Sequence, residues 1–286
     1  MLPEYINSDS LDTFIENAFA EDIGDGDHSS LASIPRAAKN KAHFLMKEDG
    51  IIAGVALCKM IFERVEPTMI IETLVKDGDV VKSGDIIIRL EGFSRAILMC
   101  ERLILNCMQR MSGIASHTVY LNTLIHGTGA KLLDTRKTTP NFRMMEKWAV
   151  LIGGGVNHRY GLFDMIMLKD NHIDFAGGIK KAVASTKAYL KETGKNLKIE
   201  VETRNLEEVE AALETKAVDR IMLDNMDLEL MRKAIKLIDG RSETEASGGI
   251  TEETIQAVAE TGVDYISVGA LTHSIKSIDI SLKAVE

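Results

Sequence analysis

The feature that most constrains the fold is an alternation of short apolar segments with longer helical segments, which runs from residue 131 to residue 268. The apolar segments have the length of strands and follow one another at intervals of roughly 20–35 residues. Strands connected by helical crossovers of this length run parallel in one sheet. The predicted strands are 131–133, 165–168, 198–201, 220–223, 244–246 and 264–268, and the predicted helices between them are 144–150, 178–192, 206–214, 228–238 and 253–260.

Each of these strands ends in polar residues, and in β/α barrels the carboxyl ends of the strands form the active site. Six strand–helix units are visible, fewer than a complete barrel contains, so the barrel is expected to be incomplete. The last two strands lead into Ser247-Gly248-Gly249 and Gly269-Ala270. Glycine allows backbone N–H groups to approach phosphate oxygens closely, so both loops are predicted to bind phosphate.

The first 113 residues have another pattern and are predicted to form a separate α/β domain, with the barrel domain over residues 114–273. In the first domain, the segment Asp77–Asp85 has strong turn chemistry and is predicted to be a hairpin. The segment has the form of half a lipoyl or biotinyl carrier domain, but the chain has no lysine motif at a second hairpin tip. The predicted strands are 42–46, 51–53, 70–75 and 86–90, and the predicted helices are 11–20, 56–66, 94 to beyond 111, and 116–125.

Composition excludes several classes of protein. The 286 residues are 45% hydrophobic and 27% charged, as in soluble globular proteins. No run reaches the roughly 18 apolar residues of a membrane span, and the N-terminus lacks the pattern of a secretory signal, so a cytoplasmic location is expected. Three cysteines fit neither a disulfide framework nor a paired-cysteine zinc site. The net charge of -9 argues against nucleic acid as the main partner.

The segment from Leu133 to Asn171 is positively charged, unlike the chain as a whole. From Asp134 to His172 there are six Lys or Arg and four Asp or Glu residues, a net charge of +2. Any one of these cations alone is more simply a solvated loop charge. Together they indicate a site for a small, highly negative ligand, because arginine and lysine recognise carboxylates and phosphates. The cations that belong to the motifs of this segment are Arg136, Lys137, Arg159 and Lys169.

Two carboxylates, Glu202 and Asp224, also lie at strand ends. They could act as general acid and base, bind a metal, or stabilise a positive transition state. Carboxylates beside phosphate-binding loops favour a phosphorylated sugar with a divalent metal, and Mg²⁺ commonly takes one or two carboxylates, water and ligand phosphates. The chain has no zinc-ligand spacing, nucleophile elbow, Walker A loop or dinucleotide fingerprint.

These motifs resemble the quinolinate phosphoribosyltransferase family, also called nicotinate-nucleotide pyrophosphorylase (carboxylating). The resemblance covers essentially the whole chain, from an acidic Gly-containing loop at 21–27 to Gly269-Ala270-Leu271-Thr272-His273. One departure is Asn141-Phe142, which follows Pro140 where the family has Gly-Leu. The remaining matching segments are Glu101-Arg102, Ser112–Ala115, Asp134–Pro140, Gly153–Arg159, Lys169–His172, Glu200–Glu202, Leu223–Asn225 and Ser247–Ile250.

The resemblance implies an α/β fold of the type II phosphoribosyltransferase kind. An N-terminal open-faced α/β sandwich would join an incomplete (β/α) barrel, with residues 274–286 packing back onto the first domain. It also implies an enzyme that joins quinolinate to 5-phosphoribosyl-1-pyrophosphate (PRPP) with Mg²⁺. The products would be nicotinate mononucleotide, pyrophosphate and CO2, in de novo NAD biosynthesis. Neither nucleic acid nor a membrane would be a partner.

The resemblance also implies residue roles. Arg136, His158, Arg159 and Lys169 would hold the quinolinate carboxylates, and Arg102 would reach the site of a partner subunit in a homodimer. Whether dimers assemble into a hexamer stays open. Lys137, Glu202 and Asp224 would be catalytic, with Glu202 and Asp224 also near Mg²⁺ through substrate and water. The predicted PRPP-binding residues are Lys137, Lys169, Glu202, Asp224, Ser247, Gly248, Gly249, Gly269, Ala270 and His273.

Two related activities remain as alternatives. A phosphoribosyltransferase that uses nicotinate would bind one carboxylate, and the four cations Arg102, Arg136, Arg159 and Lys169 exceed what one carboxylate needs. A molybdenum-transport-associated relative of the same fold is the weaker alternative. A carrier or binding module, suggested by Asp77–Asp85, is the alternative from another class.

Overall fold

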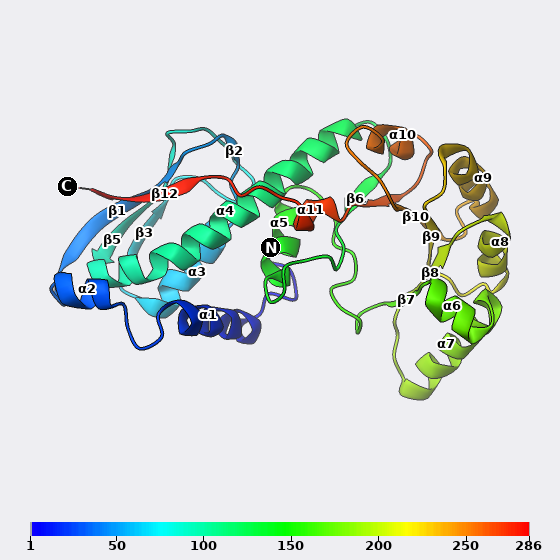
Figure 1. The fold of residues 1–286 in the computed structure, drawn as a ribbon, viewed down its shortest axis with the longest axis horizontal. Helices are drawn as coiled ribbons and strands as arrows, with labels where there is room; N and C mark the ends of the chain where they lie inside the picture. The colour runs from blue at the N-terminus through cyan, green and yellow to red at the C-terminus, as the bar shows by residue number, and fades with distance from the viewer. Residues whose placement is uncertain (1, 286) are drawn as a thin grey trace. The chain divides into compact units, whose positions relative to one another are not determined.

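The computed structural model describes residues 2–285 and divides them into two compact units. The first unit contains the described residues up to 119, residues 138–154, and those from 270 onward. The second contains residues 120–137 and 155–269. Figure 1 shows the order of the elements along the chain. Residues 138–154 group with the first unit, although they lie within the predicted barrel domain in sequence.

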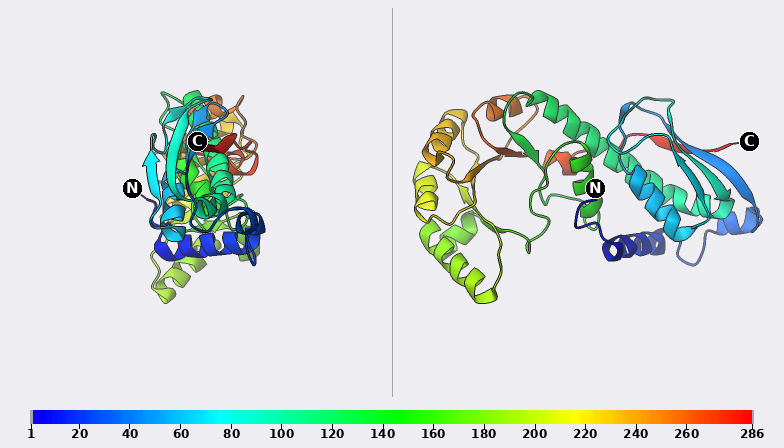
Figure 2. Two further views of the ribbon diagram at one scale, coloured as in Figure 1. Left: turned by 90° about the vertical axis from the view of Figure 1, so that its left-hand side faces the viewer. Right: turned by 180° about the vertical axis from the view of Figure 1, so that it is seen from behind.

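The first unit is built on an antiparallel sheet with the strand order β12-β1-β5-β3. The described C-terminal segment joins this sheet, because β12 pairs with β1 along its whole length. Alternate residues of β1 are buried, namely Ala42, Phe44 and Met46, and Figures 1 and 2 show α3 and α4 along one face of the sheet. The bounds are α1 Ser8–Asp22, α2 His28–Ser33, β1 Lys39–Met46, α3 Val55–Val65, β3 Ile70–Thr73, β5 Ile86–Phe93, α4 Ser94–Leu124, α5 Arg143–Ile152, α11 Ala270–His273 and β12 Ile280–Val285.

The predicted hairpin at Asp77–Asp85 is present as a long connection, because the strands on either side of the segment, β3 and β5, pair antiparallel. The segment itself also contains a strand with another partner. The short strand β4 (Val80–Val81) inside this segment pairs with β2 (Gly50–Ile51), about thirty positions earlier. The turn residues make separate local structures, because the Asp77 carboxylate accepts the first N–H groups of α3 and Asp79 and Asp85 each close a tight turn. The turn chemistry was correctly identified, but the partner of β4 lies elsewhere in the chain.

Two predicted helices are a single helix. Residues 94–111 and 116–125 were expected as separate helices, yet α4 continues through Ser112-Gly113 to Leu124. A Cβ atom at Gly113 would collide with the backbone carbonyl of Lys276. Glycine is therefore needed at this position for close packing of the C-terminal segment against the helix, rather than to end the helix.

The second unit contains a parallel sheet with the strand order β6-β11-β10-β9-β8-β7. Val156 adds a single parallel bridge to Leu133 beyond β6. β6 and β7 stand at opposite ends of this order, as expected for an incomplete barrel, so the predicted fold class is confirmed. The bounds are β6 Lys131–Leu133, β7 Ile166–Leu168, α6 Asp170–Ala176, α7 Ile179–Thr193, β8 Ile199–Thr203, α8 Leu206–Glu214, β9 Arg220–Asp224, α9 Leu228–Ile238, β10 Glu243–Ser247, α10 Ile255–Ala259 and β11 Tyr265–Ser267.

The two faces of this parallel sheet differ in chemistry. The register places Val201, Ile221 and Leu223 on one face, and Figure 2 shows helices α6 to α9 along the outside of the strands. These apolar side chains are fully buried. The alternate residues, among them Glu200 and Glu202, lie on the opposite face, which we call the inner face. The predicted site residues of the strands lie on this inner face.

Among residues 2–285, none of the helices combines the length and the apolar character needed to cross a lipid bilayer.

Candidate active site

The carboxyl ends of adjacent strands bring four predicted site residues to one edge of the sheet, in two successive levels. Leu168 pairs with Val201, so the next residue, Lys169, is level with Glu202. Lys169 Nζ lies 3.1 Å from Glu202 Oε2. Asp224 pairs directly with Ser247 on the following strand. These strand ends therefore offer a cation, two carboxylates and a hydroxyl on one side of the sheet.

Arg136 and Arg159 form the cationic part of the site. Arg136 follows β6, and Arg159 follows the segment that bridges to β6. Burial lowers the pKa of the Arg159 guanidinium, and the neighbouring charge of Arg136 lowers it further. Two guanidinium groups held close enough to oppose each other's charge provide a binding site for an anion. The Arg159 guanidinium is fixed from behind by a hydrogen bond to the Met165 carbonyl at 3.2 Å.

A buried carboxylate holds the segment that carries Arg159. Asp134 has no exposed surface. Its Oδ1 accepts the backbone N–H of His158 at 2.8 Å, and its Oδ2 accepts the side-chain amide of Asn157 at 2.6 Å. Asp134 was part of a recognised motif but had no predicted role. Its position shows that the motif residues Asp134 and Asn157 orient the site from within the fold.

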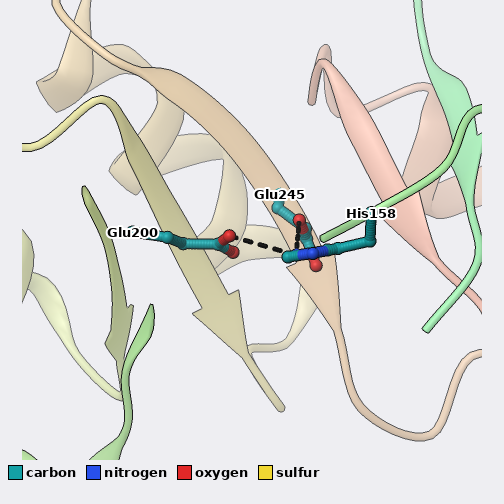
Figure 3. Close-up of side chains that lie close together, drawn as sticks. All are labelled: His158, Glu200 and Glu245. Atoms are coloured by element: carbon teal, nitrogen blue, oxygen red, sulfur yellow. Dashed lines mark ion pairs between the residues drawn. The ribbon is translucent and has the colours of Figure 1, made fainter. Parts of the chain in front are cut away.

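A second, deeper polar layer lies beneath the row of strand ends. His158 Nε2 is 3.0 Å from Glu200 Oε2 and 3.2 Å from Glu245 Oε2, as Figure 3 shows. Both glutamates are fully buried, and Glu245 Oε2 also accepts a hydrogen bond from Arg220 Nη1 at 3.1 Å. Sequence reasoning assigned no role to Glu200, Glu245 or Arg220. The available signal was the alternation of charged and apolar residues inside two predicted strands.

His158 and Glu200 titrate as a pair. Burial lowers the pKa of His158, but the two glutamates outweigh burial and raise it to about 9. Burial raises the pKa of Glu200, whereas His158 and Arg220 outweigh burial at Glu245 and lower its pKa. The backbone N–H of Arg159 donates to His158 Nδ1 at 2.6 Å, which disfavours a doubly protonated ring. The proton retained by the pair therefore lies towards Glu200.

The loop after β10 requires its glycines. Gly248 and Gly249 have φ angles of 93° and 62°, in the left-handed region. A Cβ atom on Gly248 would collide with the side chain of Asn225, which donates to Asp224 Oδ2 at 2.7 Å. Because β10 and β11 are paired, the loop of Ser247 to Gly249 and the loop that begins at Gly269 leave the same edge of the sheet.

Three predicted site residues belong to the first unit. Arg102 is exposed on α4 and makes no hydrogen bond or ion pair with any residue from 2 to 285. His273 is also exposed, and its Nδ1 lies 2.6 Å from Ser274 Oγ. Ala270 begins α11, directly after Gly269.

Two sets of residues are candidate ligands for a metal ion. Within the described part of the chain, His158, Glu200 and Glu245 are the group of three whose ligand atoms converge. A metal on Nε2 would require a proton on Nδ1, where the Arg159 N–H already points, so this group fits a metal poorly. Glu202 and Asp224 supply oxygen atoms at neighbouring strand ends. Two carboxylates fit Mg²⁺ if water and substrate oxygens complete its coordination.

Comparison with known proteins gives the family. The sequence profile of the quinolinate phosphoribosyl transferase N-terminal domain matches residues 27–112, and that of the C-terminal domain matches residues 114–283. The chain belongs to the quinolinate phosphoribosyltransferase family. The family predicted from the motifs is thereby confirmed.

Individual family members are similar over nearly their whole length. The chloroplastic nicotinate-nucleotide pyrophosphorylase (carboxylating) of Arabidopsis thaliana is 50% identical over 96% of this chain and 82% of the relative. The probable nicotinate-nucleotide pyrophosphorylase of Bacillus subtilis is 42% identical over 97% and 94%, respectively. The solved nicotinate-nucleotide pyrophosphorylase of Francisella tularensis superposes with a TM-score of 0.90 at 39% identity, covering 98% of both chains.

Proposed function

We propose that this protein is a decarboxylating quinolinate phosphoribosyltransferase. It joins quinolinate to PRPP and releases pyrophosphate and CO2, which gives nicotinate mononucleotide for de novo NAD biosynthesis. Membership of the family supports this activity. The geometric observation that carries it is the placement of Arg136 directly after β6 and of Arg159 on the neighbouring segment, which bridges to β6 at Leu133.

The cations match a dicarboxylate. Arg136 and Arg159 oppose each other in the free protein, and a ligand with two negative charges relieves that opposition. Lys169 adds a third cation, already oriented by its ion pair with Glu202. A buried carboxylate without a partner is strongly destabilising, so each quinolinate carboxylate requires its own cation. Nicotinate, with one carboxylate, would leave part of this charge unbalanced.

The carboxylates act on the ribose. Glu202 and Asp224 lie at the ends of β8 and β9, where they accept hydrogen bonds from the ribose hydroxyls. As pyrophosphate leaves, positive charge develops at the sugar C1 atom, and fixed negative groups nearby stabilise that charge. Lys137 and Lys169 neutralise the departing pyrophosphate. His273 makes a further contact to the phosphorylated substrate.

The 5-phosphate binds at the loops after β10 and β11. Ser247, Gly248 and Gly249 provide a hydroxyl and backbone N–H groups, and Gly269 and Ala270 provide backbone N–H groups from the next strand. The left-handed conformation of Gly248 and Gly249 supports this assignment, since it turns successive N–H groups towards one side.

Loss of CO2 needs little additional machinery. Once the ring nitrogen bears the ribose, it is positively charged and stabilises the carbanion left at the adjacent carbon when the 2-carboxylate departs. The protein positions the ring and partly desolvates it. Arg136, Arg159 and Lys169 supply the positioning.

Mg²⁺ is the proposed cofactor, and it would neutralise pyrophosphate charge when bound with PRPP. Glu202 and Asp224 would hold it, largely through water and substrate. Their hard oxygen donors and the placement of Asp224 and Glu202 at adjacent strand ends support the assignment.

A homodimer and a cytoplasmic location complete the proposal. Arg102 is exposed and makes no hydrogen bond or ion pair within residues 2–285, so it is available to a second subunit. The cysteines Cys58, Cys100 and Cys107 are all buried and free, which suits a reducing compartment. Burial raises the pKa of the Cys100 thiol to about 12, so it stays protonated and unreactive.

The deciding experiment supplies PRPP and Mg²⁺ with quinolinate or with nicotinate in separate reactions. Formation of nicotinate mononucleotide and CO2 from quinolinate alone is expected. Turnover of nicotinate alone would overturn the dicarboxylate assignment, and turnover of neither would favour a transport-linked binding role. An intact mass equal to that of the unmodified chain would exclude a lipoyl or biotinyl carrier.

A further inference from the structure

The buried cluster of His158, Glu200 and Glu245 is not explained by direct contact with substrate. The side chain of His158 is almost fully buried, and its Nε2 atom faces two carboxylates. A ring nitrogen in that position cannot also face a carboxylate of quinolinate. The three side chains come from three separate segments: Glu200 from β8, Glu245 from β10, and His158 from the segment after the Val156 bridge (Figure 3).

The hydrogen bonds of His158 define its role. Nδ1 accepts the backbone N–H of Arg159 at 2.6 Å, so the proton of the neutral ring lies on Nε2, between Glu200 and Glu245. The His158 backbone N–H is itself bound to Asp134. The ring thus links two strands of the sheet to the backbone of the residue that carries the guanidinium of the anion site.

The glutamates are themselves held in place. Arg220 on β9 donates to Glu245 at 3.1 Å and to Glu243 at 3.0 Å. Glu243 is half-buried and makes no contact with His158 that would hold the ring. The charged groups around His158 are therefore Glu200, Glu245 and Arg220 from the sheet, Asp134 after β6, and Arg159 from its own segment.

We propose that Glu200 and Glu245 are positioning residues for quinolinate, which hold His158 in the Nε2–H tautomer and thereby keep Arg159 directed at a substrate carboxylate. The inference rests on the proposed function, and it reassigns His158 from a substrate contact to a positioning residue. Arg159 is the group that touches substrate, and the cluster acts through it.

The proposal predicts how two variants of His158 differ. His158→Gln places an amide near the position of Nε2, so contact with the glutamates is kept but the acceptor for the Arg159 N–H is lost. His158→Asn places its amide near Nδ1 and keeps that acceptor. Loss of one oriented hydrogen bond corresponds to about a tenfold change in affinity. His158→Gln should raise the dissociation constant for quinolinate by about tenfold, and His158→Asn should recover part of that loss.

The decisive test is a double-mutant cycle with Arg159→Ala. Quinolinate dissociation constants are measured by calorimetry for His158→Gln and Glu245→Gln, alone and combined with Arg159→Ala, together with KM for PRPP and the thermal midpoint. If the cluster acts through Arg159, its variants weaken quinolinate binding only while Arg159 is present. KM for PRPP should change by less than about twofold. Glu243→Gln is the matched control, because it removes a partner of Arg220 without reaching His158, and it should leave quinolinate binding unchanged.

The experiment distinguishes failure of the positioning role from failure of the proposed function. The positioning role would be overturned if His158→Gln and Glu245→Gln weakened quinolinate binding equally with and without Arg159. It would also be overturned if they changed KM for PRPP as much as quinolinate affinity, or if neither variant weakened quinolinate binding. Wild-type protein that does not bind quinolinate would instead overturn the proposed function, and this inference with it.

Discussion

Replacing Asp134 by asparagine tests how firmly the anion site is built into the fold. Asp134 is fully buried, and its two oxygens accept from the His158 backbone and from Asn157 Nδ2, at 2.8 and 2.6 Å. Asparagine has the same size but one acceptor oxygen, so one donor must face an NH2 group. A buried donor without an acceptor costs about 1–3 kcal/mol, and we take about 2 kcal/mol here.

The expected loss is measurable by calorimetry. For a unit of this size, about 2 kcal/mol lowers the thermal midpoint by about 8 °C. Because Arg159 follows the loosened segment, KM for quinolinate should also rise, by about tenfold, while KM for PRPP stays nearly constant.

Asp227→Asn is the matched control for this substitution. Asp227 caps α9 by accepting the backbone N–H of Leu230 at 2.8 Å, and asparagine is an equally good cap, so its midpoint should hardly change. If Asp134→Asn lowers the midpoint no more than Asp227→Asn, and quinolinate kinetics are unchanged, then the buried carboxylate does not hold the site.

The other predictions concern catalysis, phosphate binding, pH and one loop. Glu202→Gln should lower kcat by about 10²–10³-fold in steady-state assays, since it removes a charge that stabilises the transition state. Gly248→Ala should raise KM for PRPP by about tenfold and spare quinolinate binding, because its φ of 93° excludes an L side chain. The pair of His158 and Glu200 retains one proton, which the raised pKa of His158, from 6.5 to about 9, reflects. The stability gained from this shared proton is complete below pH 6.5 and is lost as the pH rises through about 9, so thermal scans should show this decline, and Glu200→Gln should flatten it. Asn141→Gly should leave activity and midpoint unchanged, because Asn141 already adopts a φ of 62°, which asparagine tolerates.

The last of these predictions also explains a sequence observation. Asn141 stands where the resemblance described above gives the family a glycine. The residue adopts the left-handed conformation that glycine adopts most easily and asparagine next. Phe142 packs near Phe14, with ring centroids 5.9 Å apart. The substitution therefore preserves the backbone path of the loop.

The repeating part of the fold was predictable because its signals are local. A strand such as 198–201 was recognised from a few apolar residues before a polar end, and the structure has it at Ile199–Thr203. The spacing between such strands implies parallel pairing without knowledge of the partner. The same local reasoning located Lys169, Glu202 and Asp224 at strand ends, where the structure also has them.

The errors arose where distant segments decide the outcome. The β4 strand pairs with β2 rather than within Asp77–Asp85, and no local pattern identifies that partner. Two helices were predicted where α4 continues through Gly113, and this glycine allows the backbone at Lys276 to pack closely. Both features depend on residues far away in the chain, which turn and helix propensities do not describe.

The deeper polar layer shows what the strand pattern did contain. Parallel strands covered on both faces are usually apolar throughout, whereas β8 alternates Glu200 and Glu202 with apolar residues. Such alternation in a buried strand indicates a polar inner face. Buried ion pairs add little to stability, because desolvation offsets their attraction and apolar replacements are often as stable. Stability therefore does not explain why Glu245 and Arg220 are buried beneath the strand ends, whereas the need to orient His158, and through it Arg159, does.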